Sequence, residues 1–177
     1  LGDVYKRQTY ATMSMGGGTR PPHEFEPLMP GSVKIANYDS YRLGFNAKSE
    51  EEASEEYAKD LERAILGHNP STVSAFIAEP ISTATGIHVP NKAYFQMIRE
   101  ICDKYGVLLI CDEVITGFGR TGKMFAVEHW GITPDIMTVA KGLTSGYIPI
   151  GATIASKKVA DAFIGDDDKT FRSLITF

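Results

Sequence analysis

Two short apolar runs, each followed directly by an ionisable residue, constrain the fold of this chain more than any other feature. The first run covers residues 107–111 and is followed by Asp112, and the second covers residues 136–140 and is followed by Lys141. Continuous apolar runs of this length are typical of buried parallel strands. Ligands of an open α/β sheet bind beyond the carboxyl ends of its strands. We therefore expect an acid and an amine at one ligand-binding edge.

An acid and an amine at such an edge match the chemical needs of pyridoxal phosphate. This cofactor forms an imine with a lysine, and a carboxylate holds its pyridine nitrogen protonated so that the ring withdraws electrons. Lys141 and Asp112 suit these two roles, and Val114 would share the side of Asp112 in an extended chain and contact the ring. The alternative is that Asp112 caps a turn and that Lys141 is a solvated surface lysine. Spacing alone leaves both interpretations open.

Helix and strand patterns around these runs predict an α/β domain. Asn91 precedes a helical pattern at residues 92–105, and Gly106 marks its end. Ser49, followed by three glutamates, reads as a capping box that opens an acidic helix with a solvated face. The remaining elements are expected as strands at residues 72–78 and 151–155 and as helices at residues 50–66 and 157–164. Strands that alternate with helices are typical of a parallel sheet.

Composition excludes several classes of protein. The 177 residues suffice for one ordinary domain, and a net charge of −4 without a basic stripe argues against nucleic acid as a partner. No apolar run approaches the roughly 20 residues of a membrane span, and no signal peptide is evident. Cys102 and Cys111 lack metal-ligand spacing and are interpreted as buried thiols of a reducing cytosol.

Residues 117–122 match the G-x-G-x-x-G pattern of dinucleotide-binding proteins and follow a strand. Three features contradict that interpretation. The strand ends in two acids that would repel a pyrophosphate, no good helix begins within the glycines, and Asp135 precedes its strand although a ribose-binding acid should follow one. We therefore expect a tight loop. His129, near the single acid Glu128, is a poor metal candidate and is expected at a packed helix end.

The run D-E-V-I-T-G-F-G-R-T-G-K-M-F, followed by P-D-I-M-T-V-A-K-G-L and I-P-I-G-A, resembles the class III pyridoxal-phosphate-dependent aminotransferases. These fold type I enzymes include the ω-amino acid:pyruvate transaminases. The resemblance implies that Lys141 is the Schiff-base lysine, Asp112 the partner of the pyridinium nitrogen and Val114 the residue beneath the ring. It also implies that Glu79, in an E-P-I motif, supports the ring, and that Thr176 reaches the cofactor phosphate of the other subunit in a homodimer.

Three features depart from the pattern of this family. Many members carry a glutamate where this chain has Ala84, and a glutamine that bonds the cofactor phenol oxygen where it has Ile115. Ile115 is therefore expected beside the cofactor without that bond, and both changes favour the ω-amino acid or amine:pyruvate subgroup. Residues 6–8 stand where an aromatic-His-Gly triplet usually covers the ring.

The resemblance also sets the expected domain organisation. Residues 3–8 back-translate readily to a transposon end used in preparing sequencing libraries, so residues 1–8 are interpreted as an assembly artefact. Residues 9–177 are expected to form part of the cofactor-binding large domain, a three-layer α/β/α structure with a mostly parallel sheet. Compared with the family, the segment that holds the cofactor phosphate and the C-terminal small domain are expected to be missing.

The resemblance implies a cytoplasmic enzyme that moves an amino group from an ω-amino acid or amine to a 2-oxo acid such as pyruvate. Two alternatives stay open at this point. The same cofactor serves racemases, decarboxylases and lyases on related scaffolds, and a product assay without an amino acceptor would reveal one of these reactions. The other alternative is an inert fragment.

Overall fold

The computed structural model describes residues 9–16, 26–39 and 41–164. Its single sheet has the order β1-β2-β3-β4. The strands are β1 (Ala75–Ala78), β2 (Leu108–Asp112), β3 (Ile136–Val139) and β4 (Ala152–Ala155). The first three are parallel, and β4 runs antiparallel to β3. The expectation of an α/β fold with a mostly parallel sheet is therefore confirmed.

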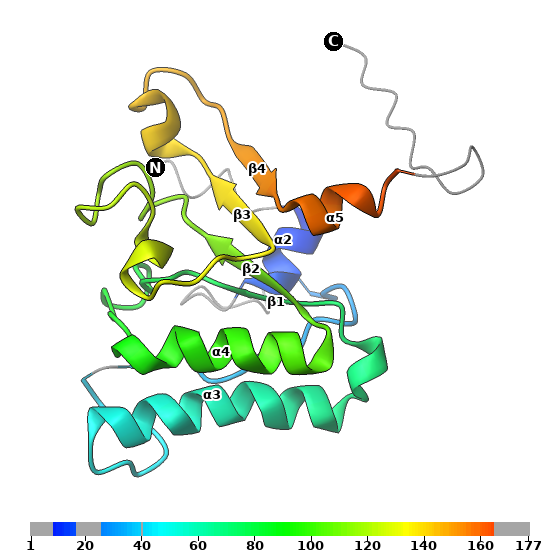
Figure 1. Ribbon diagram of the computed structural model, residues 1–177, viewed down its shortest axis with the longest axis vertical. Helices are drawn as coiled ribbons and strands as arrows, with labels where there is room; N and C mark the ends of the chain where they lie inside the picture. The colour runs from blue at the N-terminus through cyan, green and yellow to red at the C-terminus, as the bar shows by residue number, and fades with distance from the viewer. Residues whose placement is uncertain (1–8, 17–25, 40, 165–177) are drawn as a thin grey trace.

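Two long helices lie side by side next to this sheet (Figure 1). The helices are α2 (Tyr10–Met15), α3 (Glu50–Gly67), α4 (Lys92–Tyr105) and α5 (Lys157–Asp161), and the 3-10 turns are η2 (Pro70–Thr72), η3 (Ala126–His129) and η4 (Lys141–Thr144). The expected helices are confirmed, although α5 ends three residues early and η2 replaces the start of the predicted first strand. None of the helices in the described ranges is long and apolar enough to cross a membrane.

The ends of α3 and α4 follow from their capping residues. The side chain of Asn91 accepts a hydrogen bond from the N–H of Ala93 at 3.0 Å, and Gly106 adopts a left-handed φ of 69° where α4 stops. Ser49 likewise accepts from the N–H of Glu52 at 3.2 Å. The predicted capping box is only half correct, because the carboxylate of Glu52 accepts from the N–H of Lys48 rather than from that of Ser49.

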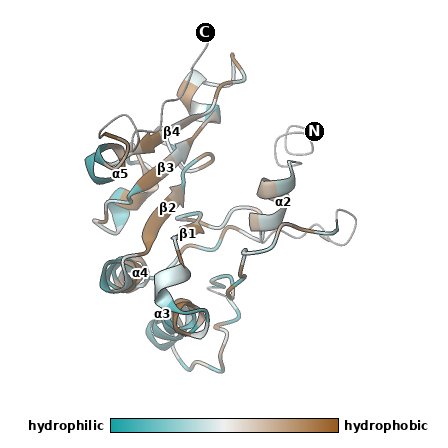
Figure 2. Ribbon diagram, turned by 90° about the vertical axis from the view of Figure 1, so that its right-hand side faces the viewer, coloured by the Kyte–Doolittle hydropathy of each residue, from teal (hydrophilic) through white to brown (hydrophobic). Residues whose placement is uncertain are grey.

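Each central strand buries only alternate residues. In β2, Leu109 and Cys111 are fully buried, whereas Leu108, Ile110 and Asp112 are half-buried. In Figure 2, α4 and α5 lie to the left of the sheet and α2 to its right. In the described residues the strands are therefore less buried than their apolar runs predict. Leu109 and Cys111 point to the side on which α4 packs, whereas Ile110 points to a side that borders a cleft lined in part by α3. We call these sides the covered face and the open face.

Aromatic rings join the helices to the loop at residues 26–39. Tyr38 of this loop packs between Tyr57 of α3 and Tyr94 of α4, with a centroid distance of 5.1 Å to each. Phe95 lies 5.2 Å from the ring of Trp130, whose indole N–H donates to the carbonyl of Asn91 at 3.1 Å. The packed element end expected near His129 is confirmed, because the buried Trp130 directly follows η3.

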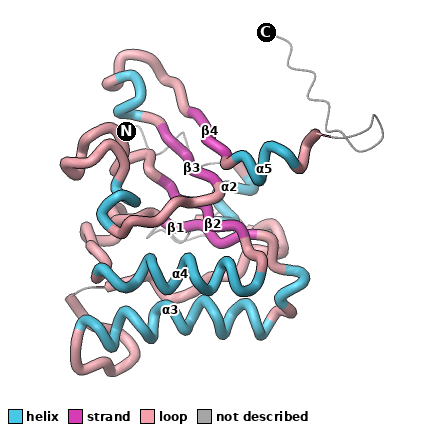
Figure 3. The backbone as a smooth tube through the Cα atoms, in the orientation of Figure 1, coloured by secondary structure: helices cyan, strands magenta, loops and turns pink. Residues whose placement is uncertain are grey.

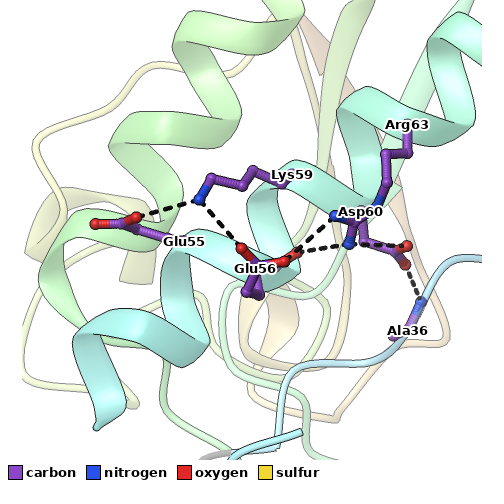
Figure 4. Close-up of polar contacts among 6 residues, drawn as sticks. All are labelled: Ala36, Glu55, Glu56, Lys59, Asp60 and Arg63. Atoms are coloured by element: carbon purple, nitrogen blue, oxygen red, sulfur yellow. Dashed lines mark hydrogen bonds and ion pairs between the residues drawn. The ribbon is translucent and has the colours of Figure 1, made fainter. Parts of the chain in front are cut away.

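The outer side of α3 carries charged residues that pair mainly with one another (Figure 4). Lys59 lies 3.3 Å from Glu55 and 3.1 Å from Glu56. Exposed pairs of this kind contribute little to stability. Asp60 differs, because its carboxylate accepts from the backbone N–H of Ala36 at 2.9 Å and so ties the 26–39 loop to α3. The predicted solvated acidic face is confirmed.

Candidate active site

The carboxyl ends of the parallel strands lie level with one another. Ala78 is the register partner of Cys111, and Asp112 is the partner of Thr138. Glu79, which follows Ala78, therefore lies level with Asp112 on the neighbouring strand. Because Cys111 points into the covered face, the alternation of the strand places Asp112 on the open face.

Asp112 closes a turn at the end of β2. Its Oδ1 accepts a hydrogen bond from the N–H of Val114 at 2.9 Å, the geometry of an Asx turn. The chain therefore bends directly after the strand, and Val114 and Ile115 both lie half-buried within this turn. The prediction that Val114 continues an extended strand is wrong. Its backbone N–H bonds to the carboxylate of Asp112 and so closes a turn in place of extending the strand.

Glu79 organises the loop that follows β1. Its Oε2 accepts from both the backbone N–H and the hydroxyl of Thr83, at 2.8 and 2.9 Å. Residues 82 and 88 then pair through two backbone hydrogen bonds of 3.1 and 3.0 Å, which close the loop. Ala84 is exposed at its tip. The carboxylate of Glu79 thus fixes this loop beside the strand end that carries Asp112.

Lys141 is the first residue of η4, two residues beyond the end of β3. Lys141 lies three residues beyond Thr138, which is the register partner of Asp112. Along the strand direction its Cα is therefore at most about 10 Å beyond the level of Asp112. The side chain is half-buried, and the backbone has a left-handed φ of 41°. Figure 3 shows that the connections after β2 and β3 consist largely of loop, apart from short helical turns. The sequence-predicted acid and amine thus follow adjacent parallel strands.

A cleft of about 990 Å³ extends over the open face. Its walls include Ile110 and Thr138 from the sheet, Glu79 from the strand end, residues 29–38 from the loop and Met15 from α2. Asp112 shares its face with Ile110 and its level with Thr138, so the acid lies next to this cleft. A ligand at the strand ends would have apolar sheet on one side and the 26–39 loop on the other.

Sequence reasoning missed the role of Glu113. This residue is fully buried, its carboxylate accepts from the hydroxyl of Thr116 and, at 2.8 Å, from the N–H of Val127, and its own N–H donates to the carbonyl of Thr138 at 2.9 Å. It therefore fastens the loop after β2 to the core. The signal in the sequence was its position next to Asp112, because alternation sends consecutive residues to opposite faces.

Asp135 lies at the opposite edge of the sheet, directly before β3. Its Oδ2 accepts from the N–H of Leu109 at 2.9 Å and from the guanidinium of Arg99 at 2.8 Å. Burial alone would raise the pKa of this carboxyl, but these two bonds outweigh burial and lower it. Residues 117–122 form successive turns without a helix. The predicted tight loop is confirmed, and neither feature has the placement that a dinucleotide requires.

Two further expectations concern metals and thiols. Cys102 and Cys111 are buried free thiols, as predicted, and burial raises the pKa of Cys102 to about 11. Within the described ranges, no three histidine, cysteine or acidic side chains gather where a metal ion could be held. Thr176 and residues 1–8 lie outside the described residues, so the structure does not place the predicted phosphate contact.

The donor set at the carboxyl edge fits pyridoxal phosphate. An amine and a carboxylate follow neighbouring strands, and the carboxylate is oriented by its bond to Val114. These are the groups that bind the aldehyde carbon and the pyridine nitrogen of this cofactor. The fold and the arrangement of these side chains are those of an α/β domain that can accommodate a small aromatic cofactor at the carboxyl edge of its sheet.

Comparison with known proteins identifies the family. A model of the family described as "Aminotransferase class-III" matches residues 3–173. The chain therefore belongs to the class-III aminotransferases, whose members depend on pyridoxal phosphate. It is 41% identical to the taurine–pyruvate aminotransferase of Bilophila wadsworthia over 98% of its own length and 38% of that protein. The chain thus spans about 38% of the length of this curated relative.

Solved structures agree with this assignment. The chain superposes on an aminotransferase of Bacillus anthracis with a TM-score of 0.85 and 38% identity, covering 93% of this chain and 37% of that one. An ω-transaminase of Pseudomonas jessenii, solved in complex with PMP, matches with a TM-score of 0.79 and 39% identity over 86% of this chain and 34% of that one. The observed sheet and helices are therefore part of the fold type I architecture.

Proposed function

We propose that the protein to which these residues belong transfers an amino group from an ω-amino acid or amine to a 2-oxo acid such as pyruvate, with pyridoxal phosphate bound to Lys141. One observation carries this proposal. Asp112 and Lys141 follow adjacent parallel strands, in a register that brings both to the same edge of the sheet. The 41% identity to a taurine–pyruvate aminotransferase supports an ω-amino donor and pyruvate as the acceptor.

In this proposal each residue has a distinct task. The bound cofactor supplies an electron sink. Asp112 accepts the pyridine N–H and keeps the proton on that nitrogen, while its bond to the N–H of Val114 fixes its orientation. Lys141 would hold the cofactor through its amine, and the same amine, once released, would be the base that accepts a proton from the substrate carbon. Val114 and Ile115 contact the ring from the turn.

Two residues support this arrangement without reacting. Glu79 holds the loop after β1 through its two bonds to Thr83, so that the wall of the site beside Asp112 stays in place. Thr176 is proposed to reach the cofactor phosphate of the second subunit, which makes the protein a homodimer. We place this homodimer in the cytoplasm, consistent with its two free buried thiols.

Removal of the Lys141 amine tests the assignment most directly. The purified chain is mixed with pyridoxal phosphate, reduced with borohydride and digested, and the cofactor is located by mass spectrometry. We expect attachment to the peptide that contains Lys141, with a visible absorption band before reduction. Lys141→Ala should lose both signals, whereas the matched variant Lys123→Ala, at an exposed loop lysine, should retain them. An equal signal in Lys141→Ala would contradict the proposal.

The donor class is tested in the full-length protein. Taurine, β-alanine and an α-amino acid are compared as donors, with pyruvate consumption as the readout. The proposal predicts faster turnover with the two ω-amino donors. A product formed without any amino acceptor would instead identify another pyridoxal-phosphate reaction, such as a decarboxylation or a racemisation.

A further inference from the structure

The loops that follow β2 and β3 each contain a residue with strained backbone. Phe118 has a φ of 58°, and Lys141 has a φ of 41°. Both values lie in the left-handed region, which costs free energy for any residue that has a Cβ. Such conformations persist only where the surrounding structure imposes them. The contacts of these two loops should therefore show what holds Lys141 in place.

Gly142, the neighbour of Lys141, packs directly against the other loop. A Cβ at position 142 would lie 2.8 Å from the Cβ of Phe118, 3.3 Å from its Cδ2 and 3.4 Å from the carbonyl oxygen of Gly117. The φ of Gly142 is not left-handed. Glycine is therefore needed here for the close approach of Phe118, and not for its backbone freedom.

The loop that carries Phe118 is itself fixed to the core. The N–H of Gly117 donates to the carbonyl of Glu113 at 2.9 Å, and the ring of Phe118 packs edge-on against Phe125, with centroids 5.5 Å apart. The buried carboxylate of Glu113 accepts from the N–H of Val127 beyond this loop. These contacts hold Phe118 in place, so it cannot easily move away from Gly142.

The loop after β3, which contains Lys141 and Gly142, is a tight turn whose backbone has little freedom to move. The N–H of Leu143 donates to the carbonyl of Ala140 at 2.9 Å, and the N–H of Gly146 donates to the carbonyl of Lys141 at 3.1 Å. Ser145 closes this turn with a left-handed φ of 53°. Any displacement of residue 142 would therefore change the backbone of Lys141, because these short hydrogen-bonded turns move as one unit.

We infer that Phe118 and Gly142 form a steric clamp that holds Lys141 in its left-handed backbone and so positions its amine at the carboxyl edge of the sheet. Both are positioning residues, since neither carries a group that reacts. The importance of the clamp for catalysis rests on the proposed function. The clamp itself is a property of the two loops and can be tested without cofactor.

Gly142→Ala tests the clamp by adding one methyl group at the contact. Because position 142 does not need a left-handed φ, and because the carbonyl oxygen of Gly117 would lie at an ordinary contact distance, the substitution acts mainly through Phe118. Gly67→Ala is the matched control, as no atom lies within 4 Å of its added Cβ and its φ is also ordinary. Phe118→Gly removes the opposing Cβ and suits the φ of 58°, so the double variant with Gly142→Ala should relieve the clash.

Amide hydrogen exchange of residues 141–147 is the first readout. We expect exchange at least about tenfold faster in Gly142→Ala, no change in Gly67→Ala and an intermediate rate in the double variant. Phe118→Gly alone removes the opposing side chain and adds no atom, and it should also accelerate exchange in this segment. It therefore tests the clamp even if Gly142→Ala does not fold. Unchanged protection in Phe118→Gly and in a folded Gly142→Ala would overturn the clamp.

Attachment of pyridoxal phosphate to Lys141 is the second readout. We expect its rate to fall at least about tenfold in Gly142→Ala and to recover partly in the double variant, while the attachment rate of Gly67→Ala stays at the wild-type value. Faster exchange with an unchanged attachment rate would overturn the positioning role. If the wild-type chain failed to attach cofactor at Lys141, the proposed function would fail, and the exchange measurement would still decide the clamp.

Discussion

The covered and open faces of the sheet differ residue by residue along β2. Leu109 and Cys111 are fully buried on the side where α4 packs, whereas Ile110 and Asp112, which alternate with them, are half-buried on the open face. At the edge of the sheet the contrast ends, because all four residues of β4 are exposed, including Ile154, which is 48% exposed although its register partner Met137 is buried. The covered face therefore supplies most of the apolar burial of the described residues, and the open face is left to bind.

The two consecutive acids at the end of β2, Asp112 and Glu113, differ in the same way as the two faces of the sheet. Glu113 is fully buried and bonded to Thr116 and Val127, so its carboxylate serves the fold. Asp112 lies on the open face, level with Thr138, which lines the cleft, and its carboxylate is the group that we propose for the pyridine nitrogen. The residue types are nearly equivalent, and the face on which each falls separates the structural role of Glu113 from the chemical role proposed for Asp112.

Truncation of neighbouring side chains in β2 should give the largest contrast between the faces. Leu109→Ala is expected to lower the free energy of unfolding by about 3–4 kcal/mol, because it leaves a cavity in the packed core. Ile110→Ala should cost about 1 kcal/mol, since its side chain borders an open cleft. Urea unfolding measures both values. Equal losses would show that another layer covers the open face in solution.

The acid pair offers a second, smaller contrast. Glu113→Gln is expected to cost about 2 kcal/mol, because the amide replaces one of the two acceptor oxygens with a donor in a buried site. Asp112→Asn should leave the urea midpoint nearly unchanged and instead reduce the visible band formed with pyridoxal phosphate. If Asp112→Asn unfolded the chain while Glu113→Gln did not, the assignment of Glu113 to the fold and of Asp112 to the site would be contradicted.

The smallest expected effect concerns Asp135 at the far edge of the sheet. Asp135→Asn keeps an oxygen for Arg99 and Leu109 but removes the charge, which should cost about 1 kcal/mol at pH 7. The pKa of Asp135 is lowered in the folded state, so its stabilisation is present above the unfolded pKa of about 3.9 and is lost as pH falls through the folded value.

Unfolding curves of the wild type and of Asp135→Asn, recorded from pH 7 downward, test this dependence. The two stabilities should differ at neutral pH and converge once the pH has fallen below the lowered folded pKa of Asp135, where both side chains are neutral. A difference that stayed constant over this range would show that the loss came from packing and not from charge.

Local signals predicted most of the elements correctly. Asn91 and Gly106 bound α4 because capping depends on a few adjacent atoms, and the apolar runs located β2 and β3 within one residue of their observed ends. Predictions that depended on partners were less accurate. Val114 lies in a turn because the Asp112 carboxylate bonds its N–H, and Glu52 bonds Lys48 instead of Ser49.

The sequence by itself determined the class of the domain, the family and the residue types at the strand ends, because periodicity, capping and motif spacing are local along the chain. Only the tertiary structure decided that Asp112 and Glu113 serve opposite faces and that Phe118 presses on Gly142. The reason is physical. These contacts join loops some 24 residues apart, and their geometry follows from strand register and close packing, which no local pattern encodes.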